Sequence, residues 1–171
     1  HIMHQNLAEI FRSLKSRNKE PGDLQGTLKR IAITAQKYFS ADLCVIFPMN
    51  PVTRTFLREK PTIKGSLSSA TKRGFIFPRE TGLAKLVLSR KILLVEENDL
   101  ENYGSPFTDI EKIRAFAGIA LFTERRKRPL AVVYLDYGKT KKFDAKFQAD
   151  LTTFVELAAS ELQTTWFFRR Y

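Results

Sequence analysis

Apolar residues at both ends of the chain recur at intervals of three and four, which is typical of helices with one buried side. The pattern predicts helices over residues 5–19, 23–40 and 144–168. Asp23, a residue type that commonly caps a helix N-terminus, opens the second of these. The first stripe consists of Leu7, Ile10, Phe11 and Leu14, and the last of Phe147, Leu151, Phe154, Ala158 and Leu162.

Short apolar runs bounded by Pro, Gly and Asn fill the middle of the chain and predict strands. These runs span 43–47, 92–95, 116–123 and 130–137, and 53–57 fits the return strand of a hairpin. Pro48 and Pro51 are expected to end the first strand. The polar residues over 59–73 predict a mobile loop.

The remaining segments predict short helices and loops. A helix is expected over 81–89, with Thr81 as its N-cap, then a loop over 96–105 and a short helix over 106–114. The start of the first helix could present free N–H groups to an anionic or carbonyl ligand atom, although an ordinary capped helix has the same sequence.

The two strands 116–123 and 130–137 are apolar at almost every position. An antiparallel pair with one face in water should instead alternate, so both faces are expected to be covered. The order of elements predicts an α+β fold with the terminal helices on one face of an antiparallel sheet. Short helices and loops would cover the other face and pack less densely, which favours a pocket there, although aromatic side chains could also fill it.

The composition is that of one soluble domain, with 171 residues, 43% hydrophobic and 27% charged. Residues 1–4 are expected to be the remnant of a tag, with a single domain over 5–171. No apolar run reaches the roughly 20 residues of a membrane span. The single cysteine and the lack of a signal peptide fit a cytoplasmic location.

Scarce residue types exclude much catalytic chemistry. The only histidines are His1 and His4, and the only cysteine is Cys44. Histidine-based acid–base catalysis, cysteine–histidine pairs and the usual zinc and haem ligand sets are therefore absent. We expect no catalytic residue, metal or cofactor, because the remaining candidates Glu96, Asp99 and Lys85 show no paired arrangement.

The net charge of +11 raises the question of a polyanionic partner. The densest run of cations is the turn Arg125–Arg128, which could bind phosphates, but so short a run is more often simply solvated. We therefore expect nucleic acid to be an unlikely partner.

Cys44 fits a core residue better than a redox sensor, and Asp136 fits the first residue of an exposed turn better than a ligand contact.

Several segments resemble the GAF domain family, and in the same order. They are the helix-to-strand junction Phe39–Pro51, the glycine-led helix Thr81–Arg90, the hairpin strands Ala115–Leu121 and Leu130–Asp136, and the closing helix Phe143–Ala158. The resemblance covers about Leu24 to Ser160. The competing PAS fold would open with two strands, whereas this chain opens with long helices.

The resemblance implies a non-enzymatic sensory domain of a signalling protein, in which a bound small molecule shifts the terminal helices. The implied ligand-binding candidates are Phe75, Phe77, Thr81, Leu83, Ala84, Tyr103, Phe107, Phe116 and Tyr134. A homodimer through the terminal helices would use Leu7, Phe11, Leu14, Leu162, Trp166 and Phe167. The alternative is a degenerate GAF domain whose pocket is full and which serves in dimerisation or protein interaction.

The ligands of well-known GAF subfamilies do not fit this sequence. The cyclic-nucleotide members carry an Asn-Lys-Phe-Asp-Glu pattern, of which Phe143 and Asp150 are partial echoes and Asp136 stands where Asn would fall. Bilin attachment needs a cysteine in the pocket region, haem binding needs histidine, and the sulfoxide reductase members need two cysteines. The ligand therefore remains open.

Overall fold

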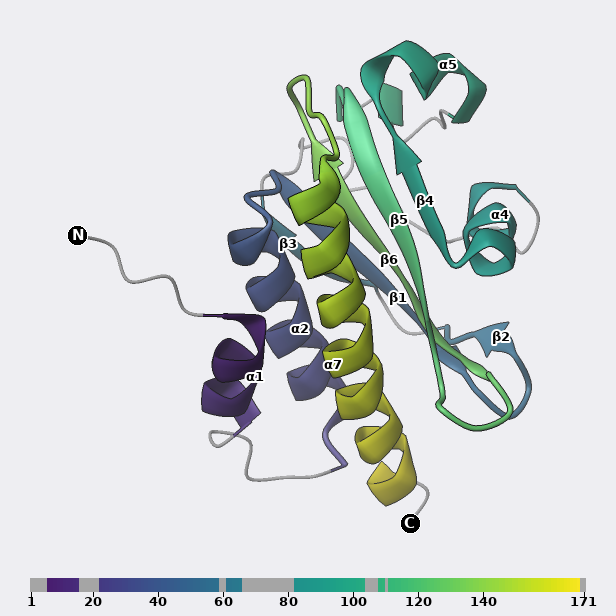
Figure 1. Cartoon of the computed structure of the whole chain (residues 1–171). Coiled ribbons are helices and arrows are strands. Elements are labelled where there is room, and N and C mark those ends of the chain that lie inside the picture. Colours follow the sequence, from purple (N-terminus) through teal and green to yellow (C-terminus); the bar gives the residue numbers. More distant parts are fainter. Residues whose placement is uncertain are drawn as a thin grey trace.

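The protein is described by a computed structural model that covers residues 6–15, 22–58, 61–65, 82–103, 108–109 and 111–169. An antiparallel sheet occupies the centre, with long helices along one face and short helices on the other side (Figure 1). The helices are α1 (Leu7–Lys15), α2 (Leu24–Tyr38), α4 (Leu83–Arg90), α5 (Leu100–Tyr103) and α7 (Ala145–Arg169), with a 3₁₀ turn at Glu97–Asp99.

The strands are β1 (Leu43–Asn50), β2 (Thr55–Phe56), β3 (Thr62–Gly65), β4 (Ile92–Val95), β5 (Ala115–Phe122) and β6 (Pro129–Tyr137). Their order is β2-β1-β6-β5-β4, and β3 pairs with β1 beside β2. All pairs are antiparallel. Every residue of β5 except Phe122, and every residue of β6 except Tyr134, is buried. The expectation that both faces of this hairpin are covered is therefore confirmed.

The terminal helices cover one face of the sheet, as predicted. Helices α1, α2 and α7 contact one another, α2 lies on β1, and α7 lies on β5 and β6 (Figure 1). The core on this side includes Ile46, Ile119 and Leu135 of the sheet. Phe39 at the end of α2 meets Phe154 of α7 edge to face, with their ring centres 5.7 Å apart.

Two predicted helices begin with side-chain caps, the expected one at Asp23 and a further one at Asp144. The Gly26 N–H donates to Oδ1 of Asp23 at 3.0 Å, and the Phe147 N–H donates to Oδ1 of Asp144 at 2.8 Å. A Cβ at Gly26 would lie 2.3 Å from the Asp23 carboxylate, so the glycine in this first turn leaves room for the cap. Asp23 and Asp144 thus fix where α2 and α7 begin.

The first strand continues through Pro48 rather than ending there, so that prediction was wrong. The Pro48 carbonyl accepts the Leu57 N–H at 2.9 Å, so its nitrogen points to the same edge of β1. On that edge β3 pairs only with Leu43–Ile46 and β2 only with Met49 and Asn50. Proline is tolerated because the N–H that it lacks would reach only Leu57, just beyond the end of the short strand β2.

Three other expectations need correction. Residues 62–65, inside the predicted loop, form strand β3 because they pair with β1. The N-cap of α4 is Gly82 rather than Thr81, with φ of 101° in the left-handed region that favours glycine. The predicted loop over 96–105 contains a 3₁₀ turn and the short helix α5, and of the predicted helix over 106–114 the described part is helical only at 108–109.

Candidate functional site

The face of the sheet opposite the terminal helices carries a second apolar cluster. It gathers Val87 of α4, Leu93 and Val95 of β4, Phe116 of β5 and Val132 of β6. Leu83, Tyr103 and Tyr134 are partly buried against it. This is the side on which the sequence predicted a pocket, and we call it the α4 face.

Strand register defines the rows of side chains on the α4 face. Residues directly opposite one another on paired strands share a face. Asp136 pairs with Leu43 on one side and with Phe116 on the other, and Phe116 pairs in turn with Val95. Asp136 therefore lies in an otherwise apolar row, next to the row that contains Tyr134.

Gly118 allows α4 to approach the sheet. A Cβ at this position would lie 2.7 Å from Cγ2 of Val87 and 3.4 Å from Cε1 of Tyr134. Tyr134 is opposite Gly118 in the register, so its ring lies across the space that a larger residue would take. The glycine thus sets the distance between α4 and the sheet and the placement of the Tyr134 ring.

Aromatic rings line the α4 face around Tyr134. Phe47 and Phe116 each meet the Tyr134 ring edge to face, with centre-to-centre distances of 6.0 and 6.2 Å. Phe56 of β2 extends the series, 6.4 Å from Phe47. Such rings combine apolar area with a negative face, to which a cation is attracted.

Asp136 is not in an exposed turn, so that prediction was wrong. Its side chain is 4% exposed, because β6 continues to Tyr137 and both of its neighbouring strands flank it. Burial, and secondarily the nearby Glu111 carboxylate, raise the pKa of Asp136 to about 7. Within the described residues no hydrogen bond or ion pair reaches its carboxylate.

Tyr134 places a second polar group on the same face. Burial, together with the charge of Asp136, raises the pKa of its phenol, so the hydroxyl is neutral. None of the described residues forms a hydrogen bond with that hydroxyl. Because buried polar groups usually have partners, the buried Asp136 carboxyl, with the partly buried Tyr134 beside it, is a feature that requires an explanation.

Five of the nine predicted ligand-binding residues lie on or beside the α4 face. Phe116 and Ala84 are buried, and Leu83, Tyr103 and Tyr134 are partly buried. The other four, Phe75, Phe77, Thr81 and Phe107, lie outside the described residues. Sequence reasoning missed Phe47 and Gly118. Asp136 could have been found from strand alternation, because it is two residues from Tyr134 and therefore on the same face.

The six predicted dimer residues have very different environments. Leu7, Phe11 and Leu162 are buried in the core of this chain. Trp166 is partly buried against that core, and the side chain of Leu14 lies outside the description. Phe167 is 61% exposed and its neighbour Phe168 49%. The exposed apolar surface at the end of α7 therefore consists of Phe167 and Phe168.

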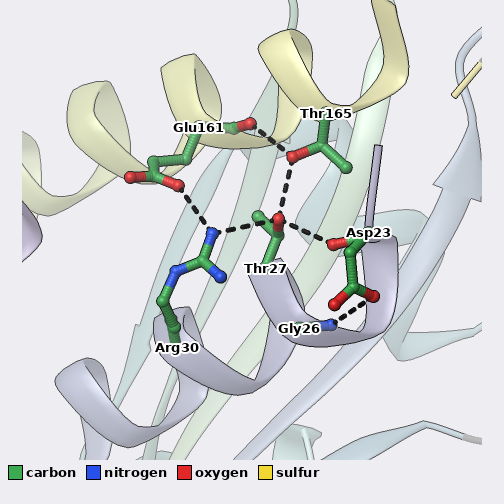
Figure 2. A network of polar contacts seen from close by, with 6 residues as sticks. All are labelled: Asp23, Gly26, Thr27, Arg30, Glu161 and Thr165. Atoms are coloured by element: carbon green, nitrogen blue, oxygen red, sulfur yellow. Dashed lines mark hydrogen bonds and ion pairs between the residues drawn. The ribbon is translucent and has the colours of Figure 1, made fainter. Parts of the chain in front are cut away.

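A polar network holds α2 against α7 (Figure 2). Oγ1 of Thr27 and Oγ1 of Thr165 lie 2.8 Å apart in a buried contact. Arg30 donates to Thr27 at 3.1 Å and to the Glu161 carboxylate at 3.3 Å. Thr27 also reaches the carbonyl of Asp23, and Thr165 that of Glu161, at 2.9 and 3.0 Å.

The hydroxyl groups of Thr27 and Thr165 together have two hydrogens, but they make three contacts that each need one as a hydrogen-bond donor. Each hydroxyl has one hydrogen, whereas two carbonyls and the contact between Thr27 and Thr165 all call for one. At any moment one of the three contacts lacks a hydrogen. The contact between α2 and α7 is thus specific, but its hydrogen bonds are not all filled at once.

The other sequence candidates lie away from the α4 face or in ordinary contacts. Cys44 is buried on the helical side, where burial raises the pKa of its thiol. Glu96 accepts the Phe143 N–H at 3.0 Å and Lys142 at 3.2 Å, which lowers the pKa of that carboxyl. Asp99 and Lys85 are exposed. The turn 124–128 is exposed at Arg125–Lys127.

The described residues offer neither a metal site nor a membrane span. No group of three or more His, Cys, Asp or Glu side chains among them is arranged to hold a metal ion. None of the described helices combines the length and apolar character needed to cross a bilayer. A ligand on the α4 face would therefore meet carboxylate, phenol and aromatic groups.

The model of the GAF domain family matches residues 23–162, and the chain belongs to this family. The GAF domain of a phosphoenolpyruvate-protein phosphotransferase from Acinetobacter superposes with a TM-score of 0.67 at 15% identity, covering 99% of this chain and 100% of that one. The corresponding domain from Coxiella burnetii gives 0.66 at 18% identity, covering 92% and 93%.

An enzyme is also among the structural neighbours. Free methionine-R-sulfoxide reductase from Neisseria meningitidis, in complex with its substrate, has a TM-score of 0.65 at 14% identity, covering 96% of this chain and 95% of that one. No curated protein matches the chain in sequence. At these identities the structural likeness concerns the fold.

Proposed function

We propose that this chain is a non-enzymatic sensory GAF domain that binds a small molecule on the α4 face and signals through α2 and α7. The observation that carries the proposal is the buried carboxyl of Asp136 beside the partly buried Tyr134, among aromatic rings on the face of the sheet opposite the terminal helices. Ligand sites are mostly apolar, with a few polar groups of this kind. The substrate held by the Neisseria neighbour supports a ligand on this fold.

Strand alternation links the two faces of the sheet. Asp136 faces α4, and the next residue, Tyr137, faces the helices. The Tyr137 hydroxyl donates to the Phe39 carbonyl at the end of α2, at 2.7 Å. Its ring also lies 6.5 Å, centre to centre, from that of Phe147 in α7. A ligand that moves Asp136 would therefore move a residue attached to both output helices.

The absence of catalysis is part of the proposal. Residues 5–171 contain no histidine, and the only thiol is buried and held protonated by the rise in its pKa. The redox cycle of a sulfoxide reductase needs reactive thiolates. A sensor needs only a difference in ligand affinity between two helix arrangements.

A ligand screen with two readouts tests this function. Melting temperatures are measured against nucleotides, amino acids, amines and aromatic acids, because a ligand of the folded state raises the melting temperature. The emission of Trp166, the only tryptophan, reports the end of α7. We expect a hit that raises the melting temperature and changes Trp166 emission, with the emission change reduced in Tyr137→Phe. A hit that leaves the emission unchanged contradicts signalling through α7.

The exposed phenylalanines at the end of α7 favour a second function, homodimerisation. Phe167 is 61% exposed and the adjacent Phe168 49% exposed, and exposed apolar surface of this kind can mark a protein interface. Analytical ultracentrifugation of the wild type and of the Phe167→Ser/Phe168→Ser double variant tests it. We expect a dimer that the double variant weakens, with Val52→Ser as the control because Val52 is 71% exposed on a turn. A monomeric wild type excludes this function.

A further inference from the structure

We propose that the ligand of the α4 face carries a compact cationic group, such as an ammonium or amidinium, which binds between the Asp136 carboxylate and the rings of Tyr134 and Phe116. This inference rests on the proposed function, because it names the class of molecule bound at the same face. The electrostatic environment of the α4 face is what indicates a cationic ligand.

The first argument is that none of the described residues is a partner of the Asp136 carboxylate. The side chain is 4% exposed, and within the described residues no donor reaches its carboxylate. A buried carboxylate is costly unless a cation or several hydrogen-bond donors compensate for lost water. In a chain with 29 lysines and arginines, none of the described ones is paired with this carboxylate. The ligand would supply a cation that the described residues do not provide.

The second argument is the sign of the local field. Glu111 is close enough to Asp136 to disfavour its ionisation, so the electrostatic field at the Asp136 carboxyl favours a cation. The neighbouring Tyr134 hydroxyl is neutral and can also accept a hydrogen bond. An anionic ligand would meet repulsion at this point of the face.

The third argument is the arrangement of the rings. Phe116 is directly opposite Asp136 in the sheet, and its ring is 6.2 Å from that of Tyr134. A cation within about 6 Å of a ring face is attracted by the ring, and more strongly where water is excluded. Carboxylate and rings would thus hold one cationic group from two sides, whereas a neutral group would gain only hydrogen bonds and apolar contact.

Binding should release a proton. At a pH below the pKa of Asp136, the free protein holds the carboxyl protonated, and an incoming cation favours the carboxylate. The proton leaves Asp136 for the buffer when the cation binds, so no other reactant is needed. The number of protons released on binding can be measured with the wild-type protein alone.

Three probes of nearly the same shape test the inference: benzamidine, which is cationic, benzamide, which is neutral, and benzoate, which is anionic. Backbone amide NMR shifts of Gly118, Tyr134 and Asp136 follow binding to the whole chain. We expect saturable shifts with benzamidine, at least about tenfold weaker binding of the other two, and a loss of about tenfold to a hundredfold in Asp136→Asn. Asp99→Asn, which removes an exposed carboxylate, should bind benzamidine as the wild type does.

Titration calorimetry at pH 6 in buffers of different ionisation enthalpy should detect the released proton in the wild type and none in Asp136→Asn. The inference is overturned if benzamidine gives no saturable shift, if Asp136→Asn binds it unchanged, or if no proton is released. Binding of benzamide or benzoate at the α4 face as tight as that of benzamidine overturns the cationic class but leaves the sensory function standing. Failure of every compound in the broader screen contradicts the function itself.

Discussion

Replacing Asp136 with asparagine should stabilise the protein above neutral pH. The amide has the shape of the carboxyl group but cannot ionise, so the variant avoids a buried negative charge. Burial and Glu111 raise the pKa of Asp136 from its ordinary value of 3.8 to about 7. Each unit of pKa corresponds to about 1.4 kcal/mol, so ionisation lowers the free energy of unfolding by up to about 4 kcal/mol.

The sign of the effect sets the pH window. Between about pH 4 and 7 the folded protein keeps the proton while the unfolded chain has lost it, so the stability of the wild type falls as pH rises. Above pH 7 both states are ionised and the full cost remains. Asp136→Asn should therefore gain stability relative to the wild type through this window and keep that gain above it.

Urea unfolding at pH 4.5, 6, 7.5 and 9, followed by Trp166 emission, measures the difference. The titratable groups around Asp136 are Glu111, Tyr134 on the same strand, and Cys44 and Tyr137, whose pKa values its charge raises. Asp99→Asn removes the same charge from an exposed site and serves as the control. A difference between wild type and Asp136→Asn that does not change between pH 4.5 and 9 would refute the buried carboxyl.

Three more predictions follow from contacts on the two faces. Gly118→Ala should cost about 1–3 kcal/mol because its Cβ would meet Val87 at 2.7 Å, and Val87→Ala should recover part of that loss in urea unfolding. Thr165→Val should cost about 1–2 kcal/mol, and a double-mutant cycle with Thr27→Val should show coupling rather than additivity. The Cys44 thiol should react with an aromatic disulfide at pH 8 only as fast as the protein opens, so unfolding in urea should accelerate the reaction sharply; rapid reaction of the folded protein would contradict its burial.

The long-range plan of the fold could be predicted from the sequence because it depends on repeated patterns. Helical spacing in 23–40 and 144–168 predicted α2 and α7, and the caps at Asp23 and Asp144 fixed their starts. The unbroken apolar runs of β5 and β6 indicated cover on both faces. Each of these signals extends over many residues, so single irregularities do not erase it.

Local exceptions could not be predicted because their cause lies on other strands. Pro48 is tolerated inside β1 because its nitrogen points to the edge where only the short strands β2 and β3 pair, so a single hydrogen bond to Leu57 is lost. Residues 62–65 are polar enough to resemble a loop, yet pairing with β1 makes them a strand. Propensity describes a residue alone, whereas strand formation depends on a partner.

The candidate site divides in the same way. Tyr134, Phe116 and Leu83 were expected on the α4 face because aromatic and apolar residues in these segments must be buried somewhere. Asp136 was assigned to a turn because aspartate at the end of a strand is usually exposed. Gly118 and Phe47 gave no signal, because their roles depend on Val87 and Tyr134, which reach them from other elements.

The sequence by itself determined the apolar faces of the long helices α2 and α7, the burial of both faces of strands β5 and β6, and the scarcity of histidine and cysteine. Those properties follow from residue type and spacing along one chain. Only the tertiary structure decided that a carboxyl group and a phenol share the α4 face without described partners, and that the next residue along β6, Tyr137, contacts the end of α2 and a residue of α7. The physical reason is that burial and electrostatic energy depend on neighbours in space, and those neighbours come from strands and helices distant in sequence.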